Sequence, residues 1–352
     1  MRADVDGGSA RVIVQVAPPG QGGVADFVQC LNAVWNAQGL ASHTLALSKA
    51  NARELALVDR IGRLVSETRL PCSLVLHFSG YGYAARGVCF WLLEELRVLR
   101  ARHGGPLKLI VVFHETFATG PPWRSAFWVS PLQERIAVRL ASMADAVWTN
   151  TDEHARWLRP RMRDSAPIAV RPVLSNVGEP RTLLPSSERD SCAVVFGLAS
   201  TRQRAFDGLR EHETLLQQLG VTELIEVGNG PASTHALHSI ACRHAGRLDQ
   251  PALTQLLGRA RFGVVHYPSH HLGKSGVFAA YAAHGCVTLN TCATSLDADG
   301  LAAGTHYLSL PTLAGVGAST AGFDAIATQL SAWYADHTVD VQARELLALA
   351  TR

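Results

Sequence analysis

The sequence predicts an α/β fold with two Rossmann-like domains. Short apolar runs that are typical of buried strands alternate with longer amphipathic stretches that are typical of helices. This alternation predicts parallel sheets with helices on both faces. The alternating series occurs twice, and a chain of 352 residues is long enough for two domains that each have a core.

The predicted elements follow one another in chain order. The first series of strands is Val12–Val16, His43–Leu47, Ser73–Phe78, Leu107–Phe113, Ala146–Thr149 and Ile168–Val170. The second series is Ala193–Leu198, Glu223–Val227, Phe262–Tyr267 and Val287–Asn290. Helical stretches between them include Phe27–Gln38, Gly87–Arg102 and Ala205–Leu219.

The boundary between the domains is predicted within residues 171–191. This segment is polar and rich in proline, and a new buried strand begins after it. We therefore predict one domain over residues 1–172 and a second over residues 173–327. Helices over residues 328–352 are expected to pack back on the first domain.

The composition excludes several classes of protein. With 47% hydrophobic and 17% charged residues the chain is globular, and its net charge of +3 with scattered arginines predicts no nucleic-acid partner. The seven cysteines include no C-x-x-C pair, which predicts reduced thiols and a cytoplasmic location. No stretch approaches the roughly 18–20 apolar residues that span a bilayer, so we predict no transmembrane segment, while peripheral membrane contact stays open.

A glycine-rich loop follows the first predicted strand. Gly20, Gly22 and Ala25 fit the G-x-G-x-x-A spacing of a dinucleotide site, although a plain tight turn or the loop of another ligand fits as well. A dinucleotide site needs an acidic residue at the end of the next strand to hold the ribose. That strand ends at Ser48 and Lys49 without a carboxylate, which argues against this alternative.

The first candidate phosphate site is the start of a helix in the second domain. This helix is predicted to begin at Gly276 and to end at Gly285, a left-handed C-cap. Lys274 and Ser275 precede it, and they join the free N–H groups and positive dipole of the helix start in a combination that suits a phosphate.

Two other functions of this segment are open. Gly273, Lys274 and Ser275 match the end of a Walker A loop, but Pro268 replaces its first glycine, and the strand after the helix, CVTLN, lacks an aspartate for magnesium. A P-loop phosphotransferase is therefore a weaker alternative. A lysine that precedes a helix without binding any ligand is the other.

Further candidates end two more strands of the second domain. Arg202 and Arg204 follow the first of them, where guanidinium groups suit a diphosphate, and with Lys274 they would hold opposite sides of one pyrophosphate. Gly228 and Gly230 would let the backbone approach a base or ribose. Because these cations would neutralise a leaving diphosphate, a bound metal is unnecessary for that purpose, and we expect no metal and no cofactor.

Together these segments resemble the two-domain GT-B glycosyltransferases, in particular the family-4-like group that uses nucleotide-sugar donors. The glycine loop at Gly22 and Gly23 and the strand end VVFHET at Val111–Thr116 resemble segments of the first domain of that family. The remaining similar segments, in the family's order, are ADAVWTNTDEHARWL, EVGNGP, AGRLDQPALTQLLGRARFGVVHYPS and GVFAAYAAHGCVTLNT.

The resemblance implies two domains that face each other across a cleft, with the acceptor in the first domain and the nucleotide sugar in the second. It also implies transfer of a sugar to an acceptor hydroxyl, with His114 as the catalytic or donor-contacting residue at its strand end. Glu115 is the alternative if a carboxylate base is needed. Because side chains alternate along a strand, only one of the two can point into the cleft.

One departure keeps a non-catalytic, nucleotide-sugar-binding relative open. The family carries two glutamates, eight residues apart, and the matching positions here are Leu272 and Ala280. Metal ligands are not evident either, because His270 and His271 are adjacent and project in different directions. The D-x-D sequence at Asp297–Asp299 is expected in a surface loop.

Overall fold

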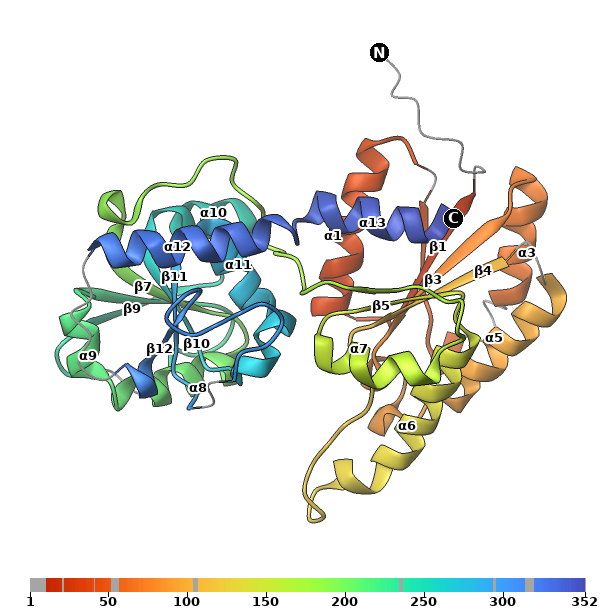
Figure 1. Cartoon of the computed structure of the whole chain (residues 1–352), viewed down its shortest axis with the longest axis horizontal. Helices are drawn as coiled ribbons and strands as arrows, with labels where there is room; N and C mark the ends of the chain where they lie inside the picture. Colours follow the sequence, from red (N-terminus) through yellow and green to blue (C-terminus); the bar gives the residue numbers. More distant parts are fainter. Residues whose placement is uncertain are drawn as a thin grey trace. The chain divides into compact units, whose positions relative to one another are not determined.

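The computed structural model describes residues 11–20, 22–40, 42–51, 57–103, 107–233, 237–293, 296–313 and 320–351. The chain divides into two compact units (Figure 1). The first unit is Met1–Arg171 together with Val339–Arg352, and the second is Pro172–Thr338.

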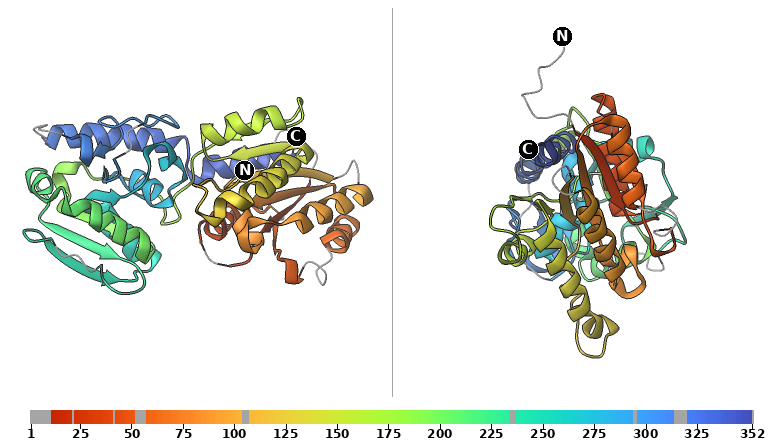
Figure 2. Two further views of the ribbon diagram at one scale, coloured as in Figure 1. Left: turned by 90° about the horizontal axis from the view of Figure 1, so that it is seen from below. Right: turned by 90° about the vertical axis from the view of Figure 1, so that its right-hand side faces the viewer.

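A six-stranded parallel sheet forms the centre of the first unit, in the order β2-β1-β3-β4-β5-β6. Its strands are β1 (Val12–Ala17), β2 (Ser42–Ala46), β3 (Cys72–Phe78), β4 (Leu107–Phe113), β5 (Ala146–Thr149) and β6 (Ile168–Val170). Its helices are α1 (Gly23–Ala37), α3 (Leu57–Thr68), α4 (Gly80–Tyr83), η1 (Ala85–Gly87), α5 (Phe90–His103), α6 (Ser125–Met143), α7 (Asp152–Leu158), η2 (Arg159–Arg161) and α13 (Val339–Thr351). Apolar side chains of α3, α5 and α6 bury one face of the sheet (Figure 2).

The second unit contains another six-stranded parallel sheet, in the order β12-β11-β10-β7-β8-β9. Its strands are β7 (Asp190–Phe196), β8 (Glu223–Val227), β9 (Ala241–Gly246), β10 (Ala260–Val265), β11 (Val287–Asn290) and β12 (Leu308–Ser309). Its helices are η3 (Ser186–Glu188), α8 (Ala199–Arg210), α9 (Glu213–Gln218), α10 (Gln250–Arg259), η4 (Ser269–Lys274), α11 (Gly276–His284), η5 (Leu310–Thr312) and α12 (Thr320–Ala335). Helices α8 and α9 cover one face of the sheet, and α10 and α11 cover the other.

The predicted fold class, α/β with two Rossmann-like domains, is confirmed. Each predicted strand is found. Most are nearly continuous apolar runs, which is what a strand buried on both faces requires, whereas β2 is largely exposed. Strands β9 and β12 were not predicted: β9 is a largely exposed edge strand without an apolar run, and β12 has only two residues. The predicted helix Ala205–Leu219 is two helices, α8 and α9.

The last two helices belong to different units. Helix α12 lies with the second unit, where Tyr334 donates a hydrogen bond to Glu179 at 2.7 Å. Helix α13 lies with the first unit. It accepts hydrogen bonds from Trp35 at the carbonyl of Ala343 (3.0 Å) and from Ser73 at the carbonyl of Ala350 (2.6 Å). The final helix is therefore part of the first core.

All seven cysteines are free thiols. Four of them, Cys72, Cys89, Cys192 and Cys286, are buried, and burial raises the pKa of the Cys72 thiol to about 12. Buried thiols of this kind are unreactive. Within the described parts of the chain, no helix has both the length and the apolar character needed to cross a bilayer.

Candidate functional site

Strand order points to one functional edge in each sheet. In open α/β sheets ligands bind outside the carboxyl ends of the strands, at the point where the strand order reverses. The order reverses between β1 and β3 in the first unit and between β7 and β10 in the second. The segments after these strands contain the glycine loop, Arg202, Arg204 and Lys274–Gly276, whereas His114 and Glu115 follow β4, and Gly228 and Gly230 follow β8.

In the first unit the glycine loop follows β1 and starts α1. Gly22 is the N-cap of α1, with φ 135°, a backbone conformation that strongly favours glycine. Apart from the adjoining residues of the loop and helix, no atom of the described residues lies within 4 Å of a Cβ built on Gly22 or Gly23, so the loop is open there. Asp26 occupies the first turn of α1, and its charge favours a sugar or another neutral group over a phosphate.

The end of β2 lacks the acidic group of a dinucleotide site. Ser48 and Asn51 bond to each other's backbone there, and the amide of Asn51 donates to the carbonyl of Ala46 at 2.9 Å. The turn is therefore closed by neutral side chains. A dinucleotide site at the glycine loop would need an acidic residue at this strand end, and Ser48 to Asn51 do not supply one.

His114 follows β4 and belongs to a buried chain of polar side chains. It is 9% exposed, and its Nε2 lies 3.2 Å from Nδ1 of His77, which is fully buried in β3. The other ring nitrogen of His77 lies 2.8 Å from Oε1 of Gln15 in β1. Gln15 in turn donates to Asn32 of α1 at 2.7 Å. Phe27 of α1 packs edge-on against both imidazoles.

The hydrogen bonds between these side chains determine which ring nitrogens of the two histidines carry the shared protons. Burial, and then the charge of His114, lowers the pKa of His77 well below its usual value, so His77 is neutral. Because Oε1 of Gln15 can only accept, Nε2 of His77 carries its proton. Nδ1 of His77 therefore accepts a hydrogen bond from Nε2–H of His114.

Glu115 points the other way. It is exposed, whereas His114 is buried, as alternation along an extended segment requires. Its carboxylate accepts a hydrogen bond from Ser79, which follows β3, at 3.2 Å. A carboxylate in this position is accessible to an acceptor hydroxyl, and the imidazole of His114 is held by its neighbours.

In the second unit two helix starts flank the reversal point. Helix α8 begins after β7, and α11 begins after η4, which follows β10. Neither helix has an acidic residue in its first turn. The N–H groups and dipoles of both helices therefore favour an anion at this edge.

Basic residues accompany these helix starts. Arg204 is exposed on the second turn of α8, and its Nε donates to the carbonyl of Ser200 at 3.2 Å. Lys274 ends η4 and is half-buried. Ser275 is the N-cap of α11 and accepts a hydrogen bond from the N–H of Phe278, which leaves its hydroxyl proton for another acceptor. Gly276 is the first residue of that helix.

The prediction that Arg202 holds a phosphate is wrong. Its guanidinium is 0% exposed and donates to the carboxylate of Glu226 at 2.7 Å. It also donates to the carbonyls of Gly197, Asn229 and Pro231 at 2.7–3.1 Å. With its donors directed at protein acceptors, Arg202 joins the ends of β7 and β8 and is a structural residue.

Of the two glycines after β8, Gly228 has the same structural basis. A Cβ on Gly228, where φ is 153°, would lie 2.2 Å from a nitrogen of Arg202 and 2.4 Å from the carbonyl of Gly197. Gly228 is therefore required for packing against Arg202. At Gly230 the nearest described atom to an added Cβ is 3.8 Å away, so a ligand can approach more closely there.

Three candidate functional residues, two in the first unit and one in the second, were not predicted from the sequence. His77 and Gln15 are polar residues inside otherwise apolar strands, and that contrast was the available signal. His266 follows β10, and its Nδ1 lies 2.9 Å from Oγ1 of Thr291. As the residue directly after β10, His266 lies at the carboxyl edge of the sheet, and burial, then the charge of Arg204, lowers its pKa.

The positions that carry glutamates in the resembled family are apolar here and inaccessible. Leu272 and Ala280 are both 0% exposed. The predicted helix cap is confirmed, because Gly285 has left-handed backbone angles (φ 68°, ψ 27°) and ends α11. The helix is thus placed as predicted, but neither position offers a carboxylate to a ligand.

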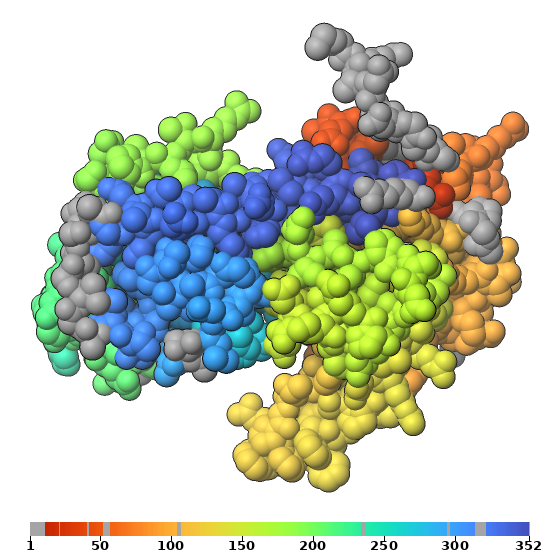
Figure 3. Space-filling view, viewed as in Figure 1, coloured from red at the N-terminus to blue at the C-terminus, as the bar shows by residue number. Residues whose placement is uncertain are grey.

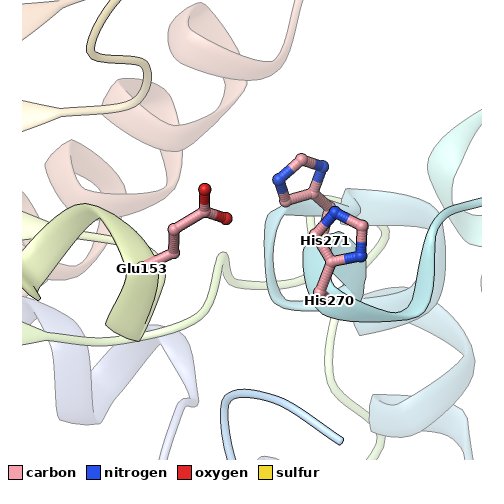
Figure 4. A group of neighbouring side chains, drawn as sticks. All are labelled: Glu153, His270 and His271. Atoms are coloured by element: carbon pink, nitrogen blue, oxygen red, sulfur yellow. The ribbon is translucent and has the colours of Figure 1, made fainter. Parts of the chain in front are cut away.

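Two adjacent histidines of the second unit are candidate metal ligands. His270 and His271 lie on η4 with their ring centroids 4.2 Å apart (Figure 4). Glu153, also labelled there, belongs to α7 of the first unit. Two adjacent histidines are fewer than the three protein ligands of a typical catalytic zinc site. Absence of a resident metal stays a prediction.

The Asp297–Asp299 segment forms a turn, as expected. Asp299 has φ 54°, and its carbonyl accepts a hydrogen bond from the indole of Trp333 at 2.9 Å. An isolated bridge pairs Ala298 with Leu301 and closes the turn. This arrangement accounts for the segment by local structure.

Comparisons with known proteins place the fold. No protein-family model matches the sequence, and no curated protein matches it. An α-glucosyltransferase in complex with UDP and a 13-mer DNA containing an HMU base is 12% identical, with a TM-score of 0.61 over 98% of this chain and 100% of that chain. Sucrose-phosphate synthase from Thermosynechococcus elongatus is 13% identical, with a TM-score of 0.58 over 96% and 98%. A glycosyltransferase from Rickettsia africae ESF-5 is 10% identical, with a TM-score of 0.56 over 97% of each chain.

At these identities the similarity establishes the fold and leaves the reaction to be inferred from the site. The chain has the α/β fold of the two-domain GT-B glycosyltransferases, with one Rossmann-like sheet in each unit.

Proposed function

We propose that this protein is a glycosyltransferase that moves a sugar from a nucleotide-sugar donor to an acceptor hydroxyl. The observation that carries the proposal is the carboxyl edge of the second sheet, where two helix starts without acidic residues lie beside Arg204 and Lys274. Such an edge suits a diphosphate. Neighbours of the same fold were solved with UDP or UDP-glucose, which supports this class of donor.

The donor would occupy the second unit and the acceptor the first. Lys274, Arg204, Ser275 and the N–H groups from Gly276 onward would hold the diphosphate, with Gly230 beside the nucleoside. The open loop at Gly22 and Gly23, near His114, would receive the acceptor or the transferred sugar. The placement of the residues within each unit supports these proposed roles.

Ligand-induced stabilisation tests the donor class. A nucleoside diphosphate or its sugar should raise the free energy of unfolding by about 2.7 kcal/mol at a hundred times its dissociation constant. The measurement is a thermal-shift series with UDP, GDP, dTDP and ADP species. A response to Mg-ATP alone would support the P-loop phosphotransferase instead.

Lys274→Ala tests the diphosphate site itself. Loss of a charge-assisted hydrogen bond, worth roughly 1.5–3 kcal/mol, should weaken nucleoside diphosphate binding about ten- to a hundredfold and nucleoside binding little. Arg210→Ala is the matched control, because it removes an exposed cation from the far end of α8. Equal losses for diphosphate and nucleoside would place Lys274 away from the phosphates.

The catalytic roles of His114 and Glu115 are separable by two variants. A positioned general base contributes typically 10²–10⁴-fold in rate, so His114→Ala should lower turnover at least about a hundredfold and donor affinity less than tenfold. Glu115→Gln should give the larger turnover loss only if the carboxylate is the base. Near-normal turnover in both folded variants would exclude this strand end from the mechanism.

A non-catalytic nucleotide-sugar-binding protein is the second candidate function, and the buried Leu272 and Ala280 favour it. It would bind the donor without releasing nucleoside diphosphate during prolonged incubation with acceptors. We further propose that transfer needs neither metal nor cofactor, so EDTA should leave turnover nearly unchanged. Loss of turnover that Mg²⁺ or Mn²⁺ restores would contradict this part of the proposal.

Two expectations about partners and location are tested separately. Several α-glucosyltransferase structures of this fold were solved with DNA, whereas we propose that this protein binds no nucleic acid, because its net charge is only +3. Anisotropy of labelled DNA at low salt would measure this. A cytoplasmic location, proposed from the free thiols, is checked by fractionation of cells.

A further inference from the structure

The start of α6 in the first unit carries a group of exposed aromatic side chains. Trp123 is 84% exposed, Trp128 is 71% exposed and Phe127 is 42% exposed. All three lie within residues 123–128. Large apolar side chains that are exposed together indicate an interaction site. We call residues 119–132 the aromatic tip.

The aromatic tip projects from its unit. No residue from Glu115 to Leu132 is buried, and the first buried residue of α6 is Gln133. Figures 1 and 3 show this yellow segment extending away from the sheet of the first unit. Gln133 anchors its base by donating to the carbonyl of Arg86 at 2.6 Å and accepting from the N–H of Ala118 at 2.7 Å.

The tip is ordered by its own contacts. The indole of Trp128 donates to the carbonyl of Pro122 at 2.9 Å, and its ring packs edge-on against Phe127. The N–H of Arg124 is bonded to the carbonyl of Pro121 at 2.9 Å. Pro121 and Pro122 contribute no N–H group to this backbone. The apolar surface is therefore already formed before any partner binds.

We propose that the aromatic tip docks the protein on the surface of a lipid bilayer that contains anionic lipids. Tryptophan is enriched at membrane–water interfaces, where its ring sits at the level of the headgroups. Arg124 is the only charged residue between Glu115 and Glu134, and its sign suits an anionic surface. The chain would thus bind peripherally, through a few inserted side chains.

The dimensions of the tip favour a bilayer over a second copy of the chain. A stable protein interface uses about 20–30 residues on each side. The tip offers four large apolar side chains, the last of which is Leu132 at 38% exposure. A narrow projection of this kind fits insertion into a headgroup layer and leaves most of a protein partner uncontacted.

Flotation of the full-length protein with vesicles tests the proposal without using sugar transfer. The protein should float with vesicles of phosphatidylcholine and phosphatidylglycerol, and Trp123→Ser combined with Trp128→Ser should reduce partitioning at least about tenfold. The matched control, Trp123→Phe with Trp128→Phe, keeps the apolar rings and should retain most binding. Leu184→Ser, at an exposed leucine of the second unit, should change nothing.

Charge and oligomeric state complete the test. Arg124→Gln should reduce binding to the anionic vesicles about fivefold, because one basic residue near such a surface contributes about 1 kcal/mol, and should not affect pure phosphatidylcholine. Equal flotation of the folded double-serine variant and the parent, or no flotation of the parent, would overturn the proposal. Dimerisation of the parent that the serine variant abolishes, without vesicle binding, would identify the tip as a protein interface instead.

Discussion

Arg202 and Arg204 lie two positions apart in one helix and have opposite environments. Residues two apart in a helix project in different directions, so one arginine points inward and the other outward. Arg202 is buried against Glu226, and Arg204 is exposed at the carboxyl edge of the sheet. Burial alone would raise the pKa of Glu226, but hydrogen bonds from Arg202 and Ser233 lower it, so the pair is ionised.

This difference predicts separable effects of two substitutions. Arg202→Met removes the guanidinium that pairs with the buried carboxylate of Glu226, so that Ser233 and His244 are its remaining neighbours, and should lower the stability of the second unit by about 3–5 kcal/mol. Arg204→Ala should change stability little and weaken nucleoside diphosphate binding about tenfold. Urea unfolding and calorimetric titration measure the two effects. Normal stability of Arg202→Met, or unchanged affinity of Arg204→Ala, would contradict these assignments.

His77 predicts a dependence of stability on pH. Its pKa is lowered in the folded state, so below about pH 6.5 the unfolded chain binds the extra proton and stability falls as the pH falls. Above that pH the residue is neutral in both states and contributes no slope. The loss should reach at most about 1.4 kcal/mol per pH unit for this group.

The measurement compares urea unfolding at several pH values in the parent, His77→Gln and His43→Gln. His77→Gln should flatten the decline between pH 6.5 and 5, whatever its own cost in stability. The exposed His43, in the same unit, is the control and should leave the slope unchanged. Identical slopes in the parent and His77→Gln would mean that His77 is protonated when folded.

Helix α11 combines a structural cap with a proposed ligand contact. Ser275 caps the helix through its hydroxyl oxygen, and the same end of the helix is where the diphosphate is proposed to bind. Asn and Asp cap helices about as well as Ser, whereas Ala does not. The cap and the ligand site can therefore be changed independently.

Three variants of Ser275 separate these roles. Ser275→Ala should lower stability by about 1 kcal/mol. Ser275→Asn and Ser275→Asp should both retain the cap, and the aspartate should bind a nucleoside diphosphate at least about tenfold more weakly than the asparagine, because it places a negative charge beside the phosphates. Equal affinities of the Asn and Asp variants would mean that the anion binds elsewhere.

Over the whole molecule, the chain crosses from the second unit back to the first before α13. The returning helix is held by backbone and side-chain bonds, including Arg171 to Glu345 at 2.7 Å, and by the buried Leu346. Stability of the first unit therefore depends on the last residues of the sequence. Helix α12, with the buried Leu330, remains part of the second unit.

Leu346→Ala and Leu330→Ala form a matched pair that tests this division. Each deletes a fully buried leucine side chain, which costs about 2–5 kcal/mol. In calorimetry, Leu346→Ala should lower the midpoint temperature of the unfolding transition that nucleotide does not stabilise. Leu330→Ala should lower the midpoint temperature of the transition that nucleotide stabilises. The same transition lowered by both variants would show that the two units do not unfold separately.

The sequence by itself determined the fold class and the edge at which the site lies. Buried parallel strands need apolar runs, so β4, β5, β8 and β11 were predicted with their observed bounds, and the segments after strands were the candidates for ligand contacts. The start of α11 and its glycine cap were also legible, because helix ends need specific residues.

Only the tertiary structure decided what each polar residue in those segments does. Whether an arginine meets a ligand or a buried carboxylate depends on the neighbouring strand, as Arg202 and Glu226 show. The chain from His114 through His77 to Gln15 joins three strands that are adjacent in space and separated by dozens of residues in sequence. Local sequence determines secondary structure because its rules act over a few residues, whereas hydrogen-bond partners across a sheet are set by strand order and register, which no short segment contains.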